Sequence, residues 1–137
     1  MTAVRALIFD CDGTLADTMP LHFEAWQIIC RRHRFEFPEE RFYALGGVPS
    51  RDIIRMLGSE QNRHDLDPLR IAKEKEAEYL TRLPRVGPVR PVVDIALRHR
   101  GQIPMAVASG GSRDAIETVL QHLKIRDWFQ TVVTNED

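Results

Sequence analysis

The sequence predicts an α/β fold, in which a parallel β-sheet is flanked by helices and an all-helical block is inserted after the first strand. Three short apolar runs, at residues 6–9, 105–109 and 131–134, are typical of strands in a buried parallel sheet. Helical patterns alternate with the later runs, as parallel strands with right-handed crossovers require. Between residues 17 and 84 we find helical patterns and no strand candidate.

The elements of the first half follow in order. Ala6-Leu7-Ile8-Phe9 predicts a strand buried on both faces, and Gly13-Thr14 then turns the chain. A helix is expected over residues 20–34, with Asp17 and Thr18 as possible caps and Pro20 in its first turn. Further helices are expected near 39–45, from a Ser50 cap, and from Asp67-Pro68 to Leu83.

A segment rich in proline, residues 83–91, separates this helical block from the second half. A helix near 92–100 then leads to the apolar run that ends at Ser109, and Gly110-Gly111-Ser112 opens the next helix, which runs through Leu123. We therefore expect residues 1–16 and 85–137 to form an α/β core and residues 17–84 a helical cap.

Composition excludes several classes of protein. The chain has 137 residues, with 19 Lys and Arg against 20 Asp and Glu, so a formal charge of −1 argues against nucleic-acid binding through bulk electrostatics. Two cysteines are too few for a disulfide scaffold, and no apolar run approaches the roughly 18 residues that span a bilayer. Asp10 interrupts the N-terminal apolar run before a signal-peptide core could form. We expect a soluble protein of the reducing cytoplasm, with neither nucleic acid nor membrane as a partner.

The segment Asp10-Cys11-Asp12-Gly13-Thr14 carries the clearest chemistry. It follows the first predicted strand, at the edge where open α/β sheets bind ligands. Residues i and i+2 of extended backbone point the same way, so Asp10 and Asp12 can converge on one Mg²⁺ ion, while Cys11 points into the core. Gly13 allows backbone amides to approach a phosphoryl oxygen. An acidic turn is the simpler explanation, but this pattern arises by chance in on the order of one in a thousand chains of this length.

Asp10 to Leu15 resembles the first motif of the haloacid dehalogenase-like (HAD) phosphohydrolase superfamily, and Met105–Ser109 resembles its second motif. The chain is similar to the subgroup of β-phosphoglucomutase and fructose-1-phosphate phosphatase-like proteins. The stretches that carry this similarity are Asp17-Thr18, His22, Ala25-Trp26, Ala44-Leu45-Gly46-Gly47, Asp65-Leu66-Asp67-Pro68, Lys75 and Pro104-Met105-Ala106-Val107. The resemblance implies a Rossmann-like core, a Mg²⁺ cofactor and a small phosphorylated sugar as substrate.

The resemblance also assigns roles to residues. Asp10 would attack phosphorus and form an aspartyl-phosphate, and Asp12 would act as general acid and then as general base. The Asp10 carboxylate and the Asp12 backbone carbonyl would hold Mg²⁺. The phosphate-binding residues would be Gly13, Thr14, Ser109 and Gly110.

In the predicted cap, the resemblance points to substrate-facing residues: His22, Gly46, Gly47, Arg51 and Lys75. A single Arg or Lys on a helix more often lies on a solvated face, and a lone His on an amphipathic helix is more often packed or capping. The basic run Arg31–Arg34 suits a helix C-terminus. Trp26, Trp128 and Phe129 are expected in the core.

The superfamily also needs a lysine and an acidic pair, which in relatives lie beyond the position of residues 131–137. We therefore expect a fragment or a truncated member whose first strand has an unpaired edge and whose phosphatase turnover, as the 137-residue chain alone, is low. Two alternatives stay open: a phosphosugar mutase, and a non-catalytic domain that binds a phosphorylated ligand or a partner chain.

Overall fold

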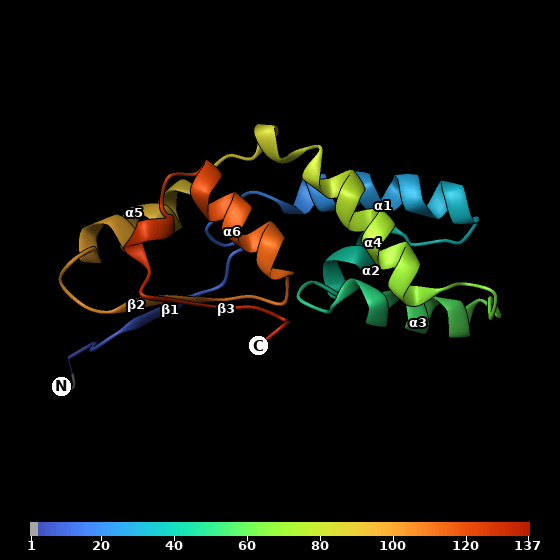
Figure 1. Ribbon diagram of the computed structural model, residues 1–137, viewed down its shortest axis with the longest axis horizontal. Helices are drawn as coiled ribbons and strands as arrows, with labels where there is room; N and C mark the ends of the chain where they lie inside the picture. Colours follow the sequence, from blue (N-terminus) through green and yellow to red (C-terminus); the bar gives the residue numbers. More distant parts are fainter. Residues whose placement is uncertain (1–2) are drawn as a thin grey trace. The chain divides into compact units, whose positions relative to one another are not determined.

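The computed structural model describes residues 3–137, which divide into two compact units. One unit consists of residues 3–18 together with 84–137, and the other is Met19–Leu83 (Figure 1). The sequence boundaries expected at 16/17 and 84/85 lie within two residues of this division. Each unit is described by itself below.

The first unit contains a parallel sheet of β1 (Leu7–Phe9), β2 (Met105–Ala108) and β3 (Thr131–Val133), in the order β1-β2-β3. Leu7 pairs with Met105 and Val107 with Val132. Helix α5 (Arg90–His99) precedes β2, and α6 (Arg113–His122) connects β2 to β3. The predicted α/β class with parallel strands is confirmed.

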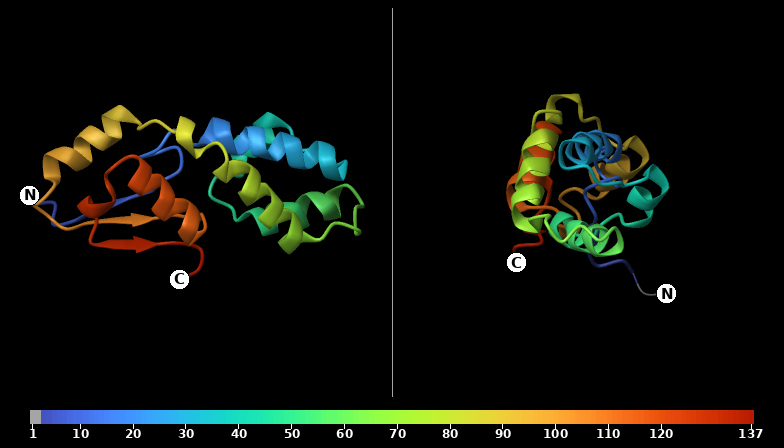
Figure 2. Two further views of the ribbon diagram at one scale, coloured as in Figure 1. Left: turned by 45° about the horizontal axis from the view of Figure 1, so that its top comes forward. Right: turned by 90° about the vertical axis from the view of Figure 1, so that its right-hand side faces the viewer.

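Both long helices of this unit lie on one face of the sheet (Figures 1 and 2). Phe9, Met105 and Val107 are accordingly buried, whereas the alternating residue Ile8 is 75% exposed. The prediction that the first strand is buried on both faces is therefore wrong for Ile8, since nothing within residues 3–137 covers its side of the sheet.

The second unit is all-helical, with α1 (Met19–His33), α2 (Glu39–Ala44), α3 (Ser50–Glu60) and α4 (Pro68–Leu80). Helix α4 packs against both α1 and α3. Its core combines aliphatic and aromatic side chains, and the Trp26 and Phe37 rings meet edge to face with centroids 5.1 Å apart. Trp26 thus occupies the core position that the sequence predicts.

The N-termini of α4 and α3 can be compared with the helix starts that the sequence predicts, and one prediction is corrected. Asp67 caps α4, because its side chain accepts a hydrogen bond from the Arg70 amide at 3.1 Å. Ser50 does not cap α3: it is already helical, and Pro49 holds the cap position with a φ of −58° and no side-chain hydrogen bond. The fixed φ of proline suits the start of a helix, so no polar cap is needed to begin the turn.

Two further predictions can be compared with the structure. Phe129 is buried as expected, but Trp128 is only partly buried and has the Arg100 guanidinium 5.4 Å from its ring centroid. In the basic run, Arg32 forms ion pairs with Glu74 and Glu78 of α4, and His33 Nε2 lies 2.8 Å from Glu74, so these side chains join α1 to α4. Among the described residues, no helix combines the length and apolar character that crossing a membrane requires.

Candidate active site

Asp10 and Asp12 follow β1 at the carboxyl edge of the sheet, as the sequence predicts. The Cys11 amide donates a hydrogen bond to Asp10 Oδ1 at 2.7 Å. The Cys11 side chain is completely buried, so the alternation that we expected across this segment is confirmed.

The electrostatics of this segment are unfavourable. Burial raises the pKa of Asp10, the Cys11 amide opposes that rise, and the neighbouring Asp12 charge adds to it. Burial, with the two aspartates beside it, also raises the pKa of the Cys11 thiol, so the thiolate form is disfavoured. Cys11 is therefore a core residue, and the ionisable groups that this segment presents at the sheet edge are the carboxyls of Asp10 and Asp12.

Thr18 lies beside the aspartate pair; the sequence indicates it as a possible helix cap and as part of a stretch that carries the family resemblance, without a role at the site. Its side chain is fully buried, and its hydroxyl donates to Asp12 Oδ1 at 2.5 Å. This bond fixes one oxygen of the Asp12 carboxylate. A buried threonine needs a hydrogen-bond partner for its hydroxyl, but the sequence does not show which group that partner is.

The loop after β2 lies beside Asp12. A Cβ atom at Gly111 would stand 3.5 Å from Asp12 Oδ2 and only 2.8 Å from the Ile116 side chain, so only glycine fits here without rearrangement. In the same loop the Gly111 amide donates to Ser109 Oγ at 3.2 Å. The Gly110 amide has no acceptor within residues 3–137. The structure thus brings the two predicted motifs together.

In the turn after Asp12, the backbone amides of Gly13 and Thr14 both donate to carbonyls of the turn. Gly13 has a φ of +73°, a left-handed conformation that suits glycine, but its amide donates to the Ala16 carbonyl at 2.8 Å. The Thr14 amide likewise donates to the Cys11 carbonyl at 3.1 Å. Both amides thus close the turn, and the roles of Gly13 and Thr14 in phosphate binding stay predictions. The Gly110 amide, also among the predicted phosphate-binding groups, has no acceptor within residues 3–137.

The two aspartates are compatible with a magnesium ion. Within residues 3–137 no group of three or more His, Cys, Asp or Glu side chains is placed to hold a metal. Mg²⁺, however, usually takes one or two carboxylates and completes its shell with water and substrate phosphate. The hard oxygen donors of Asp10 and Asp12 fit that partial set.

In the helical unit the structure joins two of the predicted substrate residues. Lys75 of α4 is 4% exposed, and its Nζ lies 2.7 Å from Nδ1 of His22 on α1. This contact joins α1 and α4 through two of the predicted substrate residues. The His22 ring also stacks on Tyr79, with centroids 3.7 Å apart.

The other predicted cap residues lie elsewhere in this unit. Arg51 is in the first turn of α3, half-exposed, with its Nε 3.8 Å from Asp52. Gly46 and Gly47 lie in the α2–α3 loop, where Gly47 has a φ of +87°. None of the three contacts the His22–Lys75 pair through a hydrogen bond or ion pair between described residues.

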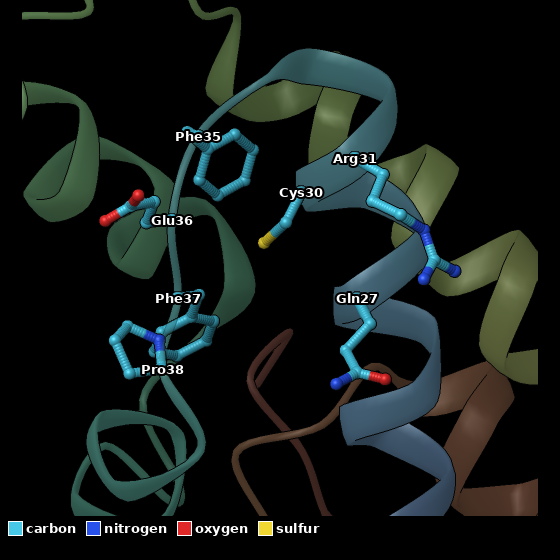
Figure 3. A pocket seen from close by; sticks show the side chains of 7 residues that line it. All are labelled: Gln27, Cys30, Arg31, Phe35, Glu36, Phe37 and Pro38. Carbon is cyan, nitrogen blue, oxygen red and sulfur yellow. The ribbon is translucent and has the colours of Figure 1, made fainter.

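A hollow of about 350 Å³ lies between α1 and the segment that follows it (Figure 3). Cys30 and the ring of Phe35 point toward each other across it, with polar side chains at its rim. The residues that line it are Gln27, Cys30, Arg31, Phe35, Glu36, Phe37 and Pro38. Burial raises the pKa of the Cys30 thiol to about 12, so this hollow holds no nucleophile and none of the predicted site residues.

The edge of the sheet thus combines an aspartate pair with a glycine-rich loop, as in hydrolases that act through an aspartate. The sequence profile of the family described as haloacid dehalogenase-like hydrolase matches residues 7–137, and the chain belongs to that family. Among curated proteins it is 38% identical, over 128 residues, to fructose-1-phosphate phosphatase YqaB of Escherichia coli K12. It is 28% identical, over 133 residues, to a phosphorylated carbohydrates phosphatase of Thermotoga maritima.

The match extends over nearly all of this chain but not of its relatives. The chain spans 67% of the E. coli protein and 61% of the T. maritima protein. Among solved structures, β-phosphoglucomutase of Clostridium difficile superposes with a TM-score of 0.85 at 19% identity, over 98% of this chain and 63% of that one. The fold and the family that the motifs predicted are therefore confirmed.

Proposed function

We propose that this chain carries the nucleophile and the acid–base residue of a Mg²⁺-dependent phosphatase that acts on a small phosphorylated sugar. The observation that supports this most is the juxtaposition of Asp10, Asp12 and the Ser109–Gly111 loop at one edge of the sheet. A nucleophile, a proton carrier and a free backbone donor are the parts that phosphoryl transfer needs, because positioning and charge stabilisation dominate that reaction.

The reaction has two steps. An Asp10 carboxylate oxygen attacks phosphorus, the bond from phosphorus to the ester oxygen breaks, and Asp12 gives its proton to the leaving alkoxide. In the second step Asp12 removes a proton from water, whose oxygen attacks the aspartyl-phosphate, so that Asp10 is released and inorganic phosphate forms. The Thr18 hydroxyl, which donates to Asp12 Oδ1, would hold this carboxyl in place during both proton transfers.

Magnesium would be held by the Asp10 carboxylate and the Asp12 backbone carbonyl, and it would supply positive charge to the transferring group. The Gly110 amide, which lacks an acceptor in residues 3–137, would donate to a phosphoryl oxygen together with the Ser109 hydroxyl. These groups together oppose the negative charge that two aspartates and a phosphate bring to one place.

The helical unit would act as a cap that excludes water and selects the substrate. The names of the E. coli and T. maritima relatives favour a phosphorylated carbohydrate as the substrate. In this unit the buried Lys75–His22 pair and the exposed Arg51 offer donors for sugar hydroxyls, and Gly46-Gly47 would form a loop at the mouth.

The test is phosphate release from a panel of hexose and pentose phosphates, with Mg²⁺ and with EDTA. It is run on the 137-residue chain and on a C-terminally extended chain. We expect Mg²⁺-dependent release that Asp10→Asn lowers by about three orders of magnitude or more, because the amide cannot form the covalent intermediate. Interconversion of sugar-phosphate isomers without net phosphate release would instead indicate the mutase. Unchanged release by Asp10→Asn would exclude Asp10 as nucleophile.

A further inference from the structure

Arg113, the first residue of α6, connects this helix to the segment that follows β3. Its guanidinium pairs with Asp137, and Nη2 also lies 3.4 Å from the Val132 carbonyl. Its backbone amide donates to Glu136 Oε1 at 3.0 Å. One residue at the start of α6 thus has three contacts with residues 132–137.

The segment after β3 is itself ordered around Asp137. The Thr134 amide donates to Asp137 Oδ2 at 2.7 Å, and the Thr134 hydroxyl lies 3.2 Å from the same oxygen. Thr134 is buried, and the Thr134 amide and the Arg113 charge lower the pKa of Asp137, so the acceptor is ionised at neutral pH. Arg113 therefore binds a preformed acceptor and not a loose terminal side chain.

This segment in turn supports the loop after β2. The Asn135 amide donates to the Gly111 carbonyl at 3.1 Å, and the Ser109 amide donates to the Val133 carbonyl at 3.0 Å. The two backbone bonds hold the Ser109–Gly111 loop from one side, while Gly111 lies against Asp12 on the other. A displacement of residues 134–137 would therefore move the Gly110 amide.

We infer that Arg113 is a positioning residue for phosphate binding: it fixes residues 134–137, which hold the Ser109–Gly111 loop where the Gly110 amide can meet a phosphoryl oxygen. The inference rests on the proposed function, because the phosphate role of that loop belongs to it. Arg113 itself contacts none of the groups that would touch the phosphate.

The experiment uses two readouts on the 137-residue chain labelled with ¹⁵N. Amide hydrogen exchange at Asn135 and Ser109 reports the loop without any ligand, and the shift of the Gly110 amide on titration with inorganic phosphate and Mg²⁺ reports affinity. Arg113→Ala should speed exchange at Asn135 about tenfold and raise the Kd for phosphate by a similar factor. Arg113→Lys should recover part of both effects, because lysine can pair with Asp137 but has no planar fork to reach Val132 as well.

Arg126→Ala is the matched control. Arg126 is about as exposed as Arg113, donates to Glu117 Oε2 at 2.5 Å and to the Phe129 carbonyl at 3.1 Å, and shares Glu117 with Arg113. This variant should leave both readouts unchanged. In an Asp137→Asn background, Arg113→Ala should have a smaller effect than in the wild-type chain, since the ion pair between the two residues is already lost.

The inference would be overturned if Arg113→Ala kept wild-type amide exchange and wild-type phosphate affinity. It would also be overturned if Arg126→Ala weakened phosphate binding as much as Arg113→Ala does. If inorganic phosphate does not shift the NMR signal of the Gly110 amide in the wild-type chain, phosphate binding by the Ser109–Gly111 loop is contradicted, and the proposed function with it. Faster exchange in Arg113→Ala would then still show that the loop restraint exists, so the two failures are distinguishable.

Discussion

The two units of this chain treat ionisable side chains in opposite ways. In the helical unit, Nζ of the buried Lys75 lies 2.7 Å from His22 Nδ1 and over the Trp26 and Tyr79 rings, at 5.7 and 5.2 Å from their centroids. In the α/β unit, Asp10 lies beside a second negative charge, and burial raises its pKa. The first arrangement stabilises a charge, and the second opposes one.

This difference indicates where function resides. Two like charges after a strand do not favour stability, whereas neighbouring ionisable groups with shifted pKa values are typical of functional sites, so we propose that the chemistry lies at the aspartate pair. The compensated charges of the helical unit are compatible with packing alone, so their role in substrate binding needs a separate test. The predictions below sharpen this contrast, from the largest expected effect to the smallest.

Removal of the Thr18 hydroxyl tests whether the aspartate pair must be held in place. We expect Thr18→Val to lower phosphate release about 10- to 100-fold, because Asp12 Oδ1 loses the Thr18 hydroxyl as a donor while the side-chain shape is retained. The free energy of unfolding should fall by about 1 kcal/mol, the usual value of one hydrogen bond. Steady-state kinetics and thermal unfolding measure the two effects.

Thr18→Ser is the matched control, since it keeps the hydroxyl and should retain most of the activity. A wild-type kcat in Thr18→Val would mean that the Thr18–Asp12 hydrogen bond stabilises the turn but does not contribute to catalysis.

Replacement of the buried lysine tests the helical unit. Lys75→Met keeps the length of the side chain and removes the charge, so the free energy of unfolding should change by about 1 kcal/mol or less. If Lys75 faces substrate, as we propose, KM for the sugar phosphate should rise about tenfold with a smaller change in kcat.

Lys75→Ala separates packing from recognition, because the void should cost about 2–3 kcal/mol in addition. A Lys75→Met protein with wild-type KM would assign this lysine to packing and remove it from the substrate site.

The smallest effect concerns stability. The folded-state pKa of Asp10 is raised, so its ionised form disfavours the fold at every pH above the ordinary value of 3.8. Asp10→Asn should therefore raise the Tm at pH 7 slightly, because Asp10 is exposed and solvent screens most of this effect. The difference should shrink as pH falls toward 3.8, where the wild-type carboxyl becomes neutral. An equal or lower Tm at pH 7 would contradict the electrostatic contrast between the units.

Much of the fold was predictable from the sequence. The three strands and the helices over 19–33, 68–80 and 113–122 follow from periodicity and from the helix starts at Asp67-Pro68 and Gly110-Gly111-Ser112. The exposure of Ile8 was not predictable, because a short apolar run does not show on which faces of a sheet helices lie. The partial exposure of Trp128 was not predictable either, because its contact with Arg100 joins residues that are far apart in the sequence.

At the candidate site, the sequence pattern gave the aspartate pair and Ser109, but not how neighbouring groups are used. The Gly13 amide donates a hydrogen bond to the Ala16 carbonyl within the turn. The Thr18 hydroxyl donates to Asp12 rather than capping a helix. Both facts depend on the three-dimensional path of residues 11–18. Arg113 could not be found either, since its partners at 132–137 become neighbours only through the parallel pairing of β2 and β3.

The central claim is that Asp10 takes the phosphoryl group covalently. The most direct measurement is to quench turnover of a sugar phosphate with acid, reduce the protein with borohydride and map the product by peptide mass spectrometry. An acyl phosphate at Asp10 would be reduced to homoserine at position 10, and Asp10→Asn would remove that signal. If turnover proceeds while position 10 remains aspartate in every quenched sample, the proposed mechanism is contradicted.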